Sequence, residues 1–228
     1  MRSRDTRATT AGLLLIAATA TSLIATAFLG SVLDGPGFLA TVGLHQDRLL
    51  AAALFQLLAA FTSAAIAVAL YPVLRQQAAG MALGAVAFRL IEGVFYALSA
   101  AGTMILVSLS GQLTAGASAH ASADLVRDLR DSAGCVGVLA FCTGATLYYL
   151  VFYRSRLIPR WLSAWGLAAG LLVLFQSIAV LSSTQVVLNL PIAAQEMVLA
   201  VWLIVKGFSP TAKPLAPAPE AAAELHPA

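Results

Sequence analysis

Three ionisable side chains lie inside stretches that are otherwise apolar: Arg89, Glu92 and Glu196. A charged side chain that faces lipid at the centre of a bilayer costs at least about 2.5–3.5 kcal/mol on insertion scales. We therefore expect all three to face the interior of a helix bundle and to contact one another. Arg89 and Glu92 are three residues apart, a spacing that places both side chains on one helix face, where they can pair.

Two roles fit such a cluster. One arginine and two carboxylates sum to a charge of −1, so one carboxyl, preferentially Glu196, is expected to hold a proton or to share Arg89 with Glu92. A carboxyl that exchanges its proton suits a site for a substrate, an ion or a proton near the middle of a membrane. Alternatively, the three charges satisfy one another and form an ion-paired staple that fixes how two helices dock. We favour the staple by a narrow margin.

The helix face that carries the first two charges continues with Tyr96, Ser99 and Thr103. This spacing predicts a polar stripe that runs from the charges toward one membrane surface. The candidate intramembrane polar site therefore consists of Arg89, Glu92, Tyr96 and Glu196.

Other polar residues in the apolar stretches have simpler explanations. Thr19, Ser22 and Thr26 share one face of the first predicted helix, where hydroxyls commonly bond back to backbone carbonyls. Gln56 and Gln176 are single amides of the kind that form hydrogen bonds between helices. None of these five residues is assigned to the candidate site.

Familiar catalytic and cofactor motifs are absent from the sequence. It contains no phosphate-binding glycine loop with Lys-Ser/Thr, no His-Glu-x-x-His, no Cys-x-x-Cys and no Gly-x-Ser-x-Gly. Cys135 and Cys142 lie too far apart on one helix for a disulfide and are expected to be small core residues. His120 and Asp124 could together bind a metal if their segment were helical. We predict no catalytic, cofactor-binding or metal-binding residues.

The composition decides which elements hold these residues. Hydrophobic residues make up 60% of the 228 residues and charged residues only 10%, whereas an ordinary soluble domain carries about 25% charged residues. The chain is therefore expected to be an all-α polytopic membrane protein, and its partner is the lipid bilayer. No basic run interleaved with aromatics supports nucleic-acid binding. Small-residue faces at Gly80/Gly84 and Gly166/Gly170 allow close helix packing, within the chain or in a homo-oligomer.

Six stretches have the roughly 20 apolar residues that a membrane-spanning helix needs. Breaks between them are predicted at 34–37, at Tyr71-Pro72, at 108–122 and at Ile158-Pro159, while Asn189 and Pro191 predict a late or kinked start for the sixth. The chain thus divides into an N-terminus (1–10), a transmembrane domain of six helices in one bundle (11–207) and a disordered Ala/Pro-rich tail (208–228). The predicted spans are 11–30, 49–70, 81–107, 134–152, 162–181 and 187–206.

The distribution of lysine and arginine predicts the orientation. Nine of the thirteen flank the spans on one side, three lie in the outer loops (Arg48, Arg127 and Arg130), and Arg89 lies within a span. Because cytoplasmic loops are enriched in these residues, both termini are expected in the cytoplasm. The outer loop is predicted to include a short surface helix with Asp124, Arg127, Asp128 and Asp131. Alternatively, the first span is a cleavable signal peptide, with Ala25-Thr26-Ala27 as the cleavage site, which would leave five spans.

Three segments resemble a known family. Ala-Phe-Arg-Leu-Ile-Glu-Gly at 87–93 is similar to the third-span motif of the DUF4386 family of bacterial integral membrane proteins. Residues 153–162 resemble its fourth loop, and residues 195–207 resemble its closing helix. The resemblance covers most of the chain except the tail and implies a multi-pass protein of the bacterial plasma membrane. It supplies no activity, because the family's function is unknown.

Three classes of function remain open. The first is a structural or interaction module of the membrane without turnover, which predicts a dry core around the charges. The second is a small ion- or proton-coupled carrier with its site at Arg89, Glu92 and Glu196, which predicts a water-accessible cavity at the midplane. The third, less favoured, is a membrane enzyme that acts on lipid with the outer-loop acids and His120. We rank them in that order and expect no enzyme activity.

Overall fold

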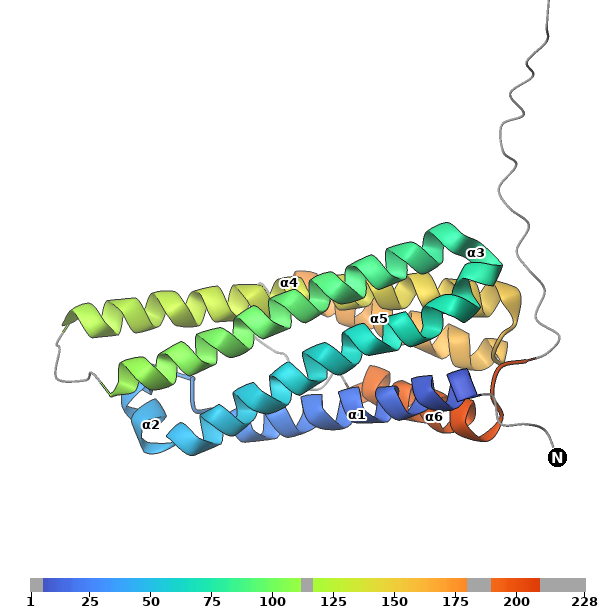
Figure 1. Ribbon diagram of the computed structural model, residues 1–228. Helices are drawn as coiled ribbons and strands as arrows, with labels where there is room; N and C mark the ends of the chain where they lie inside the picture. Colours follow the sequence, from blue (N-terminus) through green and yellow to red (C-terminus); the bar gives the residue numbers. More distant parts are fainter. Residues whose placement is uncertain (1–5, 112–116, 180–189, 210–228) are drawn as a thin grey trace, which may run out of the picture.

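The computed structural model describes residues 6–111, 117–179 and 190–209, and within these ranges every regular element is a helix (Figure 1). The prediction of an all-α fold is confirmed. Three of the described helices are long and apolar enough to cross a membrane, and a shorter apolar helix closes the chain, as expected for a membrane protein. The described residues form six helices: α1 (Thr6–Leu29), α2 (Phe38–Leu44), α3 (Gln46–Ser110), α4 (Ala117–Ser155), α5 (Arg160–Ala179) and α6 (Leu190–Val205).

Helix α3 is a hairpin that contains both the second and the third predicted spans. The backbone of Ala78 leaves the helical region (φ −157°, ψ 89°), and the chain reverses there, so that a first arm and a second arm run antiparallel (Figure 1). The predicted break at Tyr71-Pro72 is wrong, because the helix continues through Pro72. A proline removes one amide hydrogen bond but its fixed φ fits a helix, and apolar membrane helices tolerate it.

Helix α4 joins two elements that the sequence analysis separated. The predicted surface helix of the outer loop is helical, but it continues without a break into the fourth predicted span, so α4 is 39 residues long. The short helix α2 was not predicted. Helix α6 begins at Leu190 with Pro191 in its first turn, where proline needs no amide partner. Asn189, the ends of the predicted spans within 180–189 and the tail from 210 lie outside the described residues.

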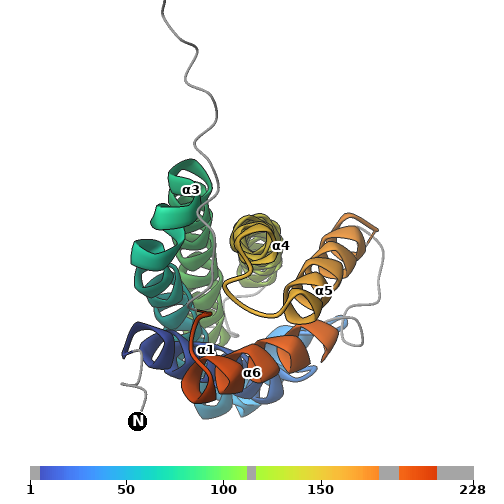
Figure 2. The ribbon, with the colours of Figure 1, turned by 90° about the vertical axis from the view of Figure 1, so that its right-hand side faces the viewer.

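The helices pack around a core in which α3 contacts α1 and α4 most extensively. Figure 2 shows α4 between α3 and α5, with α6 beside α1. Helices α1 and α6 approach closely at Gly12, where an added Cβ would lie 2.7 Å from the carbonyl oxygen of Ala200. Of the predicted small-residue faces, Gly84 and Gly166 contact neighbouring side chains, whereas an added Cβ at Gly80 or Gly170 would meet nothing within 4 Å.

The two ends of the bundle differ in charge. The first residues of α1, the bend of α3, the α4–α5 turn and the end of α6 lie together at one end (Figure 1). We call this the basic end, because these segments carry arginine and lysine side chains and none of the described acidic residues. The opposite end carries Asp34, Asp47, Asp124, Asp128 and Asp131. The cations of the basic end are Arg7, Arg75, Arg154, Arg156, Arg160 and Lys206.

Candidate functional site

Arg89 lies at the centre of the candidate site, on the second arm of α3, with 2% of its surface exposed. Its Nη1 donates to Glu92 Oε2 at 3.1 Å, one helical turn along the same arm. The spacing of the two residues therefore produces the pairing on one helix face that the sequence suggests. Glu92 is buried to the same extent as Arg89.

Ser63 ties this pair to the first arm of α3. Its hydroxyl accepts a hydrogen bond from Arg89 Nη1 at 2.8 Å and donates one to Glu92 Oε1 at 2.8 Å. The two arms of the hairpin are thus joined by a closed ring of three side chains. At Gly93 a Cβ would lie 3.3 Å from the Ala60 carbonyl oxygen, so the arms are close enough for these short side chains to meet.

Helix α4 supplies the aromatic side of the site. Arg89 Nη2 donates to the Tyr148 hydroxyl at 2.7 Å, and Tyr148 is 2% exposed. The guanidinium carbon lies 4.6 Å from the centroid of the Phe141 ring and 5.3 Å from that of Tyr148. A guanidinium over aromatic faces is stabilised by their negative π surfaces, most strongly where water is excluded.

Glu196 reaches the cluster from α6. Its Oε1 lies 3.8 Å from Arg89 Nη2, and its Oε2 accepts a hydrogen bond from Thr19 of α1 at 2.9 Å. The 3.8 Å separation is too long for a direct hydrogen bond, so Glu92 is the closer partner of the arginine. Glu196 is also the more exposed acid, with 12% of its side-chain surface accessible against 3% for Glu92.

The formal charges of the cluster do not cancel. One guanidinium and two carboxylates leave one negative charge in excess when all are ionised, and no further charged side chain of the described residues pairs with them. Arg89 Nε is buried without a hydrogen-bond partner among the described residues. Glu92 is therefore the tightly held acid of the cluster and Glu196 the loosely held one.

Tyr96 lies one helical turn beyond Glu92 on the second arm of α3. Its ring packs against Gly137 of α4, where an added Cβ would come within 2.7 Å of the ring, and no hydrogen bond joins it to the three charged residues in the described structure. Ser99 and Thr103 of the same stripe are buried. The stripe therefore lines the contact with α4.

Arg130 is a buried residue that the sequence analysis assigned to an outer loop. It lies on α4, 9% exposed, and its Nε donates to Thr103 Oγ1 at 2.8 Å. Its guanidinium also pairs with Asp131. An arginine can bury its stem, here against Gly102, and still reach a polar partner.

Several contributors were not predicted. Thr19 was expected to bond back to a carbonyl of its own helix, but it donates to Glu196 instead. Ser63 and Tyr148 were not singled out, and neither was the hydrogen bond from Tyr149 to Gln195, the residue before Glu196. The only sequence signal for them is a polar atom inside an apolar helix, which many membrane helices carry without such a role.

The weaker candidates do not form a second site. No group of three or more His, Cys, Asp or Glu side chains that could hold a metal occurs among the described residues, and His120 is exposed. Cys142 is buried as expected, but the expectation for Cys135 is wrong, because it lies on the outer surface of α4. Two hollows on the described surface are lined by residues at the C-terminal part of α6, from Met197 to Lys206, and by Thr6, Arg7, Thr10 and Ala69. Neither of these hollows includes a residue of the charge cluster.

Comparison with known proteins gives a family and no activity. A family model described as a domain of unknown function, DUF4386, matches residues 10–207. The search of curated proteins found no match. The search of solved structures also found none.

Proposed function

This chain belongs to the DUF4386 family, and from that premise we propose that it is a non-enzymatic structural or interaction module of a membrane. In this proposal the buried cluster around Arg89 is a staple that holds the helices in one arrangement. The membrane enzyme that acts on lipid with the outer-loop acids and His120 stays the less favoured alternative.

The proposed arrangement has six membrane crossings with both termini in the cytoplasm of a bacterial cell. The two arms of α3 count as separate crossings, because its 65 residues are far more than the roughly 20 that one crossing needs. The basic end faces the cytoplasm in this arrangement, as the enrichment of lysine and arginine on that side requires. Residues 1–10 and 208–228 would then be cytoplasmic segments.

The observation that carries the staple is the number of helices that meet at one guanidinium. Both arms of α3 contribute through Ser63 and Glu92, and α4 contributes through Tyr148. Helix α6 contributes Glu196, which Thr19 connects to α1. A planar guanidinium with several fixed donors suits this multiple contact better than a flexible ammonium does.

The staple is tested by a double-mutant cycle on Arg89 and Glu196. We expect Glu196→Gln and Arg89→Leu each to lower the free energy of unfolding in bilayers or detergent. The double variant should recover part of the loss, with a coupling energy of about 0.5–3 kcal/mol, the range for residues in contact. A neutral or stabilising Glu196→Gln with no coupling to Arg89 would refute the inclusion of Glu196 in the staple.

A second candidate, an ion- or proton-coupled carrier, is favoured by one feature of the same site. Glu196 is the acid with the looser contact to Arg89 and the greater exposure. Such a carboxyl can bind and release a proton while the Arg89–Glu92 pair stays closed. Helices α1 and α6 would then bracket the exchanging group, because Thr19 and Glu196 are hydrogen-bonded across them.

The carrier is tested by proton flux into liposomes that contain the purified protein. If it operates, an imposed pH gradient should drive flux that Glu196→Gln abolishes, while Asp128→Asn, an exposed acid outside the cluster, leaves flux unchanged. Flux equal to that of empty liposomes, with ion gradients of either sign, would exclude proton carriage and leave the staple as the explanation for Glu196.

A further inference from the structure

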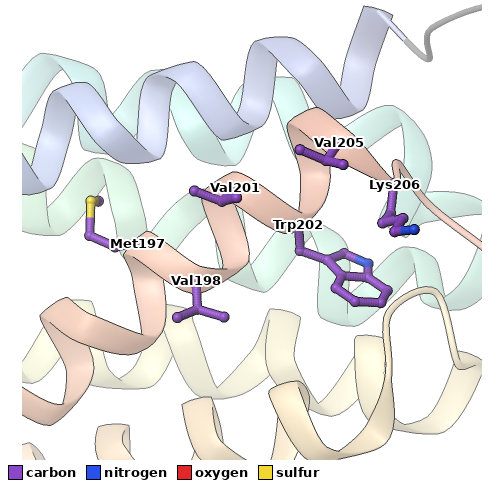
Figure 3. A pocket seen from close by; sticks show the side chains of 6 residues that line it. All are labelled: Met197, Val198, Val201, Trp202, Val205 and Lys206. Atoms are coloured by element: carbon purple, nitrogen blue, oxygen red, sulfur yellow. The ribbon is translucent and has the colours of Figure 1, made fainter.

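The outward face of α6 carries a groove that the charge cluster does not use. It has a volume of about 390 Å³, and Figure 3 shows the six side chains that line it along the helix. The opposite face of α6 carries Glu196, Leu199, Ala200 and Leu203, which are buried against the bundle. The groove is lined by Met197, Val198, Val201, Trp202, Val205 and Lys206.

The lining changes character along its length. Five of the six side chains are apolar or aromatic, and the one charge, Lys206, stands at the C-terminal end beside Trp202. Val201 and Val205 are 57% and 69% exposed, so the described residues leave the groove open to its surroundings. An apolar channel that ends in a tryptophan and a cation matches a molecule with a hydrocarbon chain and an anionic head.

The basic end strengthens the charge argument. Gly207, with φ 70°, ends α6, and the chain then turns so that the Ser209 amide donates to the Leu157 carbonyl at 2.8 Å. This hydrogen bond fixes the end of α6 to the α4–α5 turn, which carries Arg156. Lys206 therefore stands at a surface with several cations and no described acid.

We propose that the groove on α6 binds an anionic phospholipid, with an acyl chain along Val198, Val201 and Val205 and the phosphate at Lys206. The inference rests on the proposed membrane crossing of α6 but not on the charge staple, which lies on the other face of the helix. A second copy of the chain is the less favoured occupant, because its own basic end would bring like charges together in a parallel contact.

Native mass spectrometry of the full chain tests the proposal with two probe lipids, phosphatidylglycerol and phosphatidylcholine. We expect phosphatidylglycerol to bind more tightly, and Lys206→Gln to weaken it about fivefold, the factor for one lysine near an anionic headgroup. Val201→Trp, which fills the groove from an exposed position, should weaken both lipids. Arg75→Gln is the matched control, since it removes an exposed cation of the basic end that does not line the groove.

Each alternative outcome contradicts the assignment. Equal weakening by Lys206→Gln and Arg75→Gln means that the whole basic end attracts lipid without a site. Equal affinity for the two lipids removes the anionic headgroup from the proposal. Loss of a dimer in Val201→Trp, with lipid binding unchanged, assigns the groove to a second copy. Thermal unfolding of each variant separates these outcomes from misfolding, and Lys206→Gln, an exposed position, keeps the test decisive if Val201→Trp does not fold.

Discussion

Replacing Arg89 by leucine should lower the free energy of unfolding by about 3–5 kcal/mol, the range for removing one partner from a buried ion pair. The substitution leaves Glu92 buried without its cation and removes the donor that Tyr148 and Ser63 accept from. Leucine fits the apolar surroundings but cannot satisfy these oxygens. Denaturant unfolding in mixed micelles, or steric trapping in bilayers, measures the change.

Arg89→Lys separates the shape of the guanidinium from its charge. A lysine keeps the positive charge near Glu92, but one ammonium cannot reproduce the fork that contacts Ser63 through Nη1 and Tyr148 through Nη2. We expect the lysine variant to recover only part of the loss. Arg75→Leu, at an exposed position over Tyr71, serves as the control and should change stability little. An Arg89→Leu protein as stable as the original would contradict the staple directly.

Replacing Gly12 by leucine should lower the free energy of unfolding by about 3 kcal/mol, the upper part of the range for overpacked cores. A Cβ at this position would stand 2.7 Å from the Ala200 carbonyl oxygen and 2.7 Å from Ile204 Cγ1. A backbone oxygen cannot move aside as a flexible side chain can, so α1 and α6 must separate. The separation also stretches the Thr19–Glu196 hydrogen bond between the same two helices.

Gly80→Leu is the matched control for this prediction. Gly80 is a helical glycine at which an added Cβ would meet nothing within 4 Å, so leucine there should be neutral or slightly stabilising through its higher helix propensity. Thermal melting of both variants in the same detergent makes the comparison. Similar losses at the two positions would mean that glycine flexibility matters and that the α1–α6 contact does not.

The charged part of the site was predictable because a charged side chain in an apolar helix has a large free-energy cost unless it is paired. Arg89, Glu92 and Glu196 stand out in the sequence, and burial near one another is the arrangement of lowest free energy for them. Their hydroxyl partners were not predictable, because a hydroxyl can satisfy itself on its own helix. Thr62 donates to the Leu58 carbonyl at 2.7 Å, whereas its neighbour Ser63 donates to Glu92. No local feature of the sequence distinguishes these two residues.

The helical class of the fold was predictable from composition, but the exact position of the α3 reversal and the burial of Arg130 were not. Proline is a strong break signal in soluble helices, yet Pro72 lies within a helix. The reversal falls at Ala78, six residues later and still within the gap between the second and third predicted spans. Arg130 was counted with the outer loop because a charge marks a surface in most sequences. Its partner Thr103 lies on α3, across the contact between α3 and α4, and the sequence alone does not show which residues meet there.

The hairpin of α3 also bears on how the chain is made. Ser63, Arg89 and Glu92 precede α4 and α6 in the chain, so translation completes both arms of the α3 hairpin first. The arginine is therefore neutralised within its own hairpin as soon as the two arms fold together. Tyr148 and Glu196 arrive later and dock on a hairpin whose guanidinium is already paired. If the two arms cross a membrane as proposed, the hydrocarbon layer receives an arginine that already has its carboxylate partner.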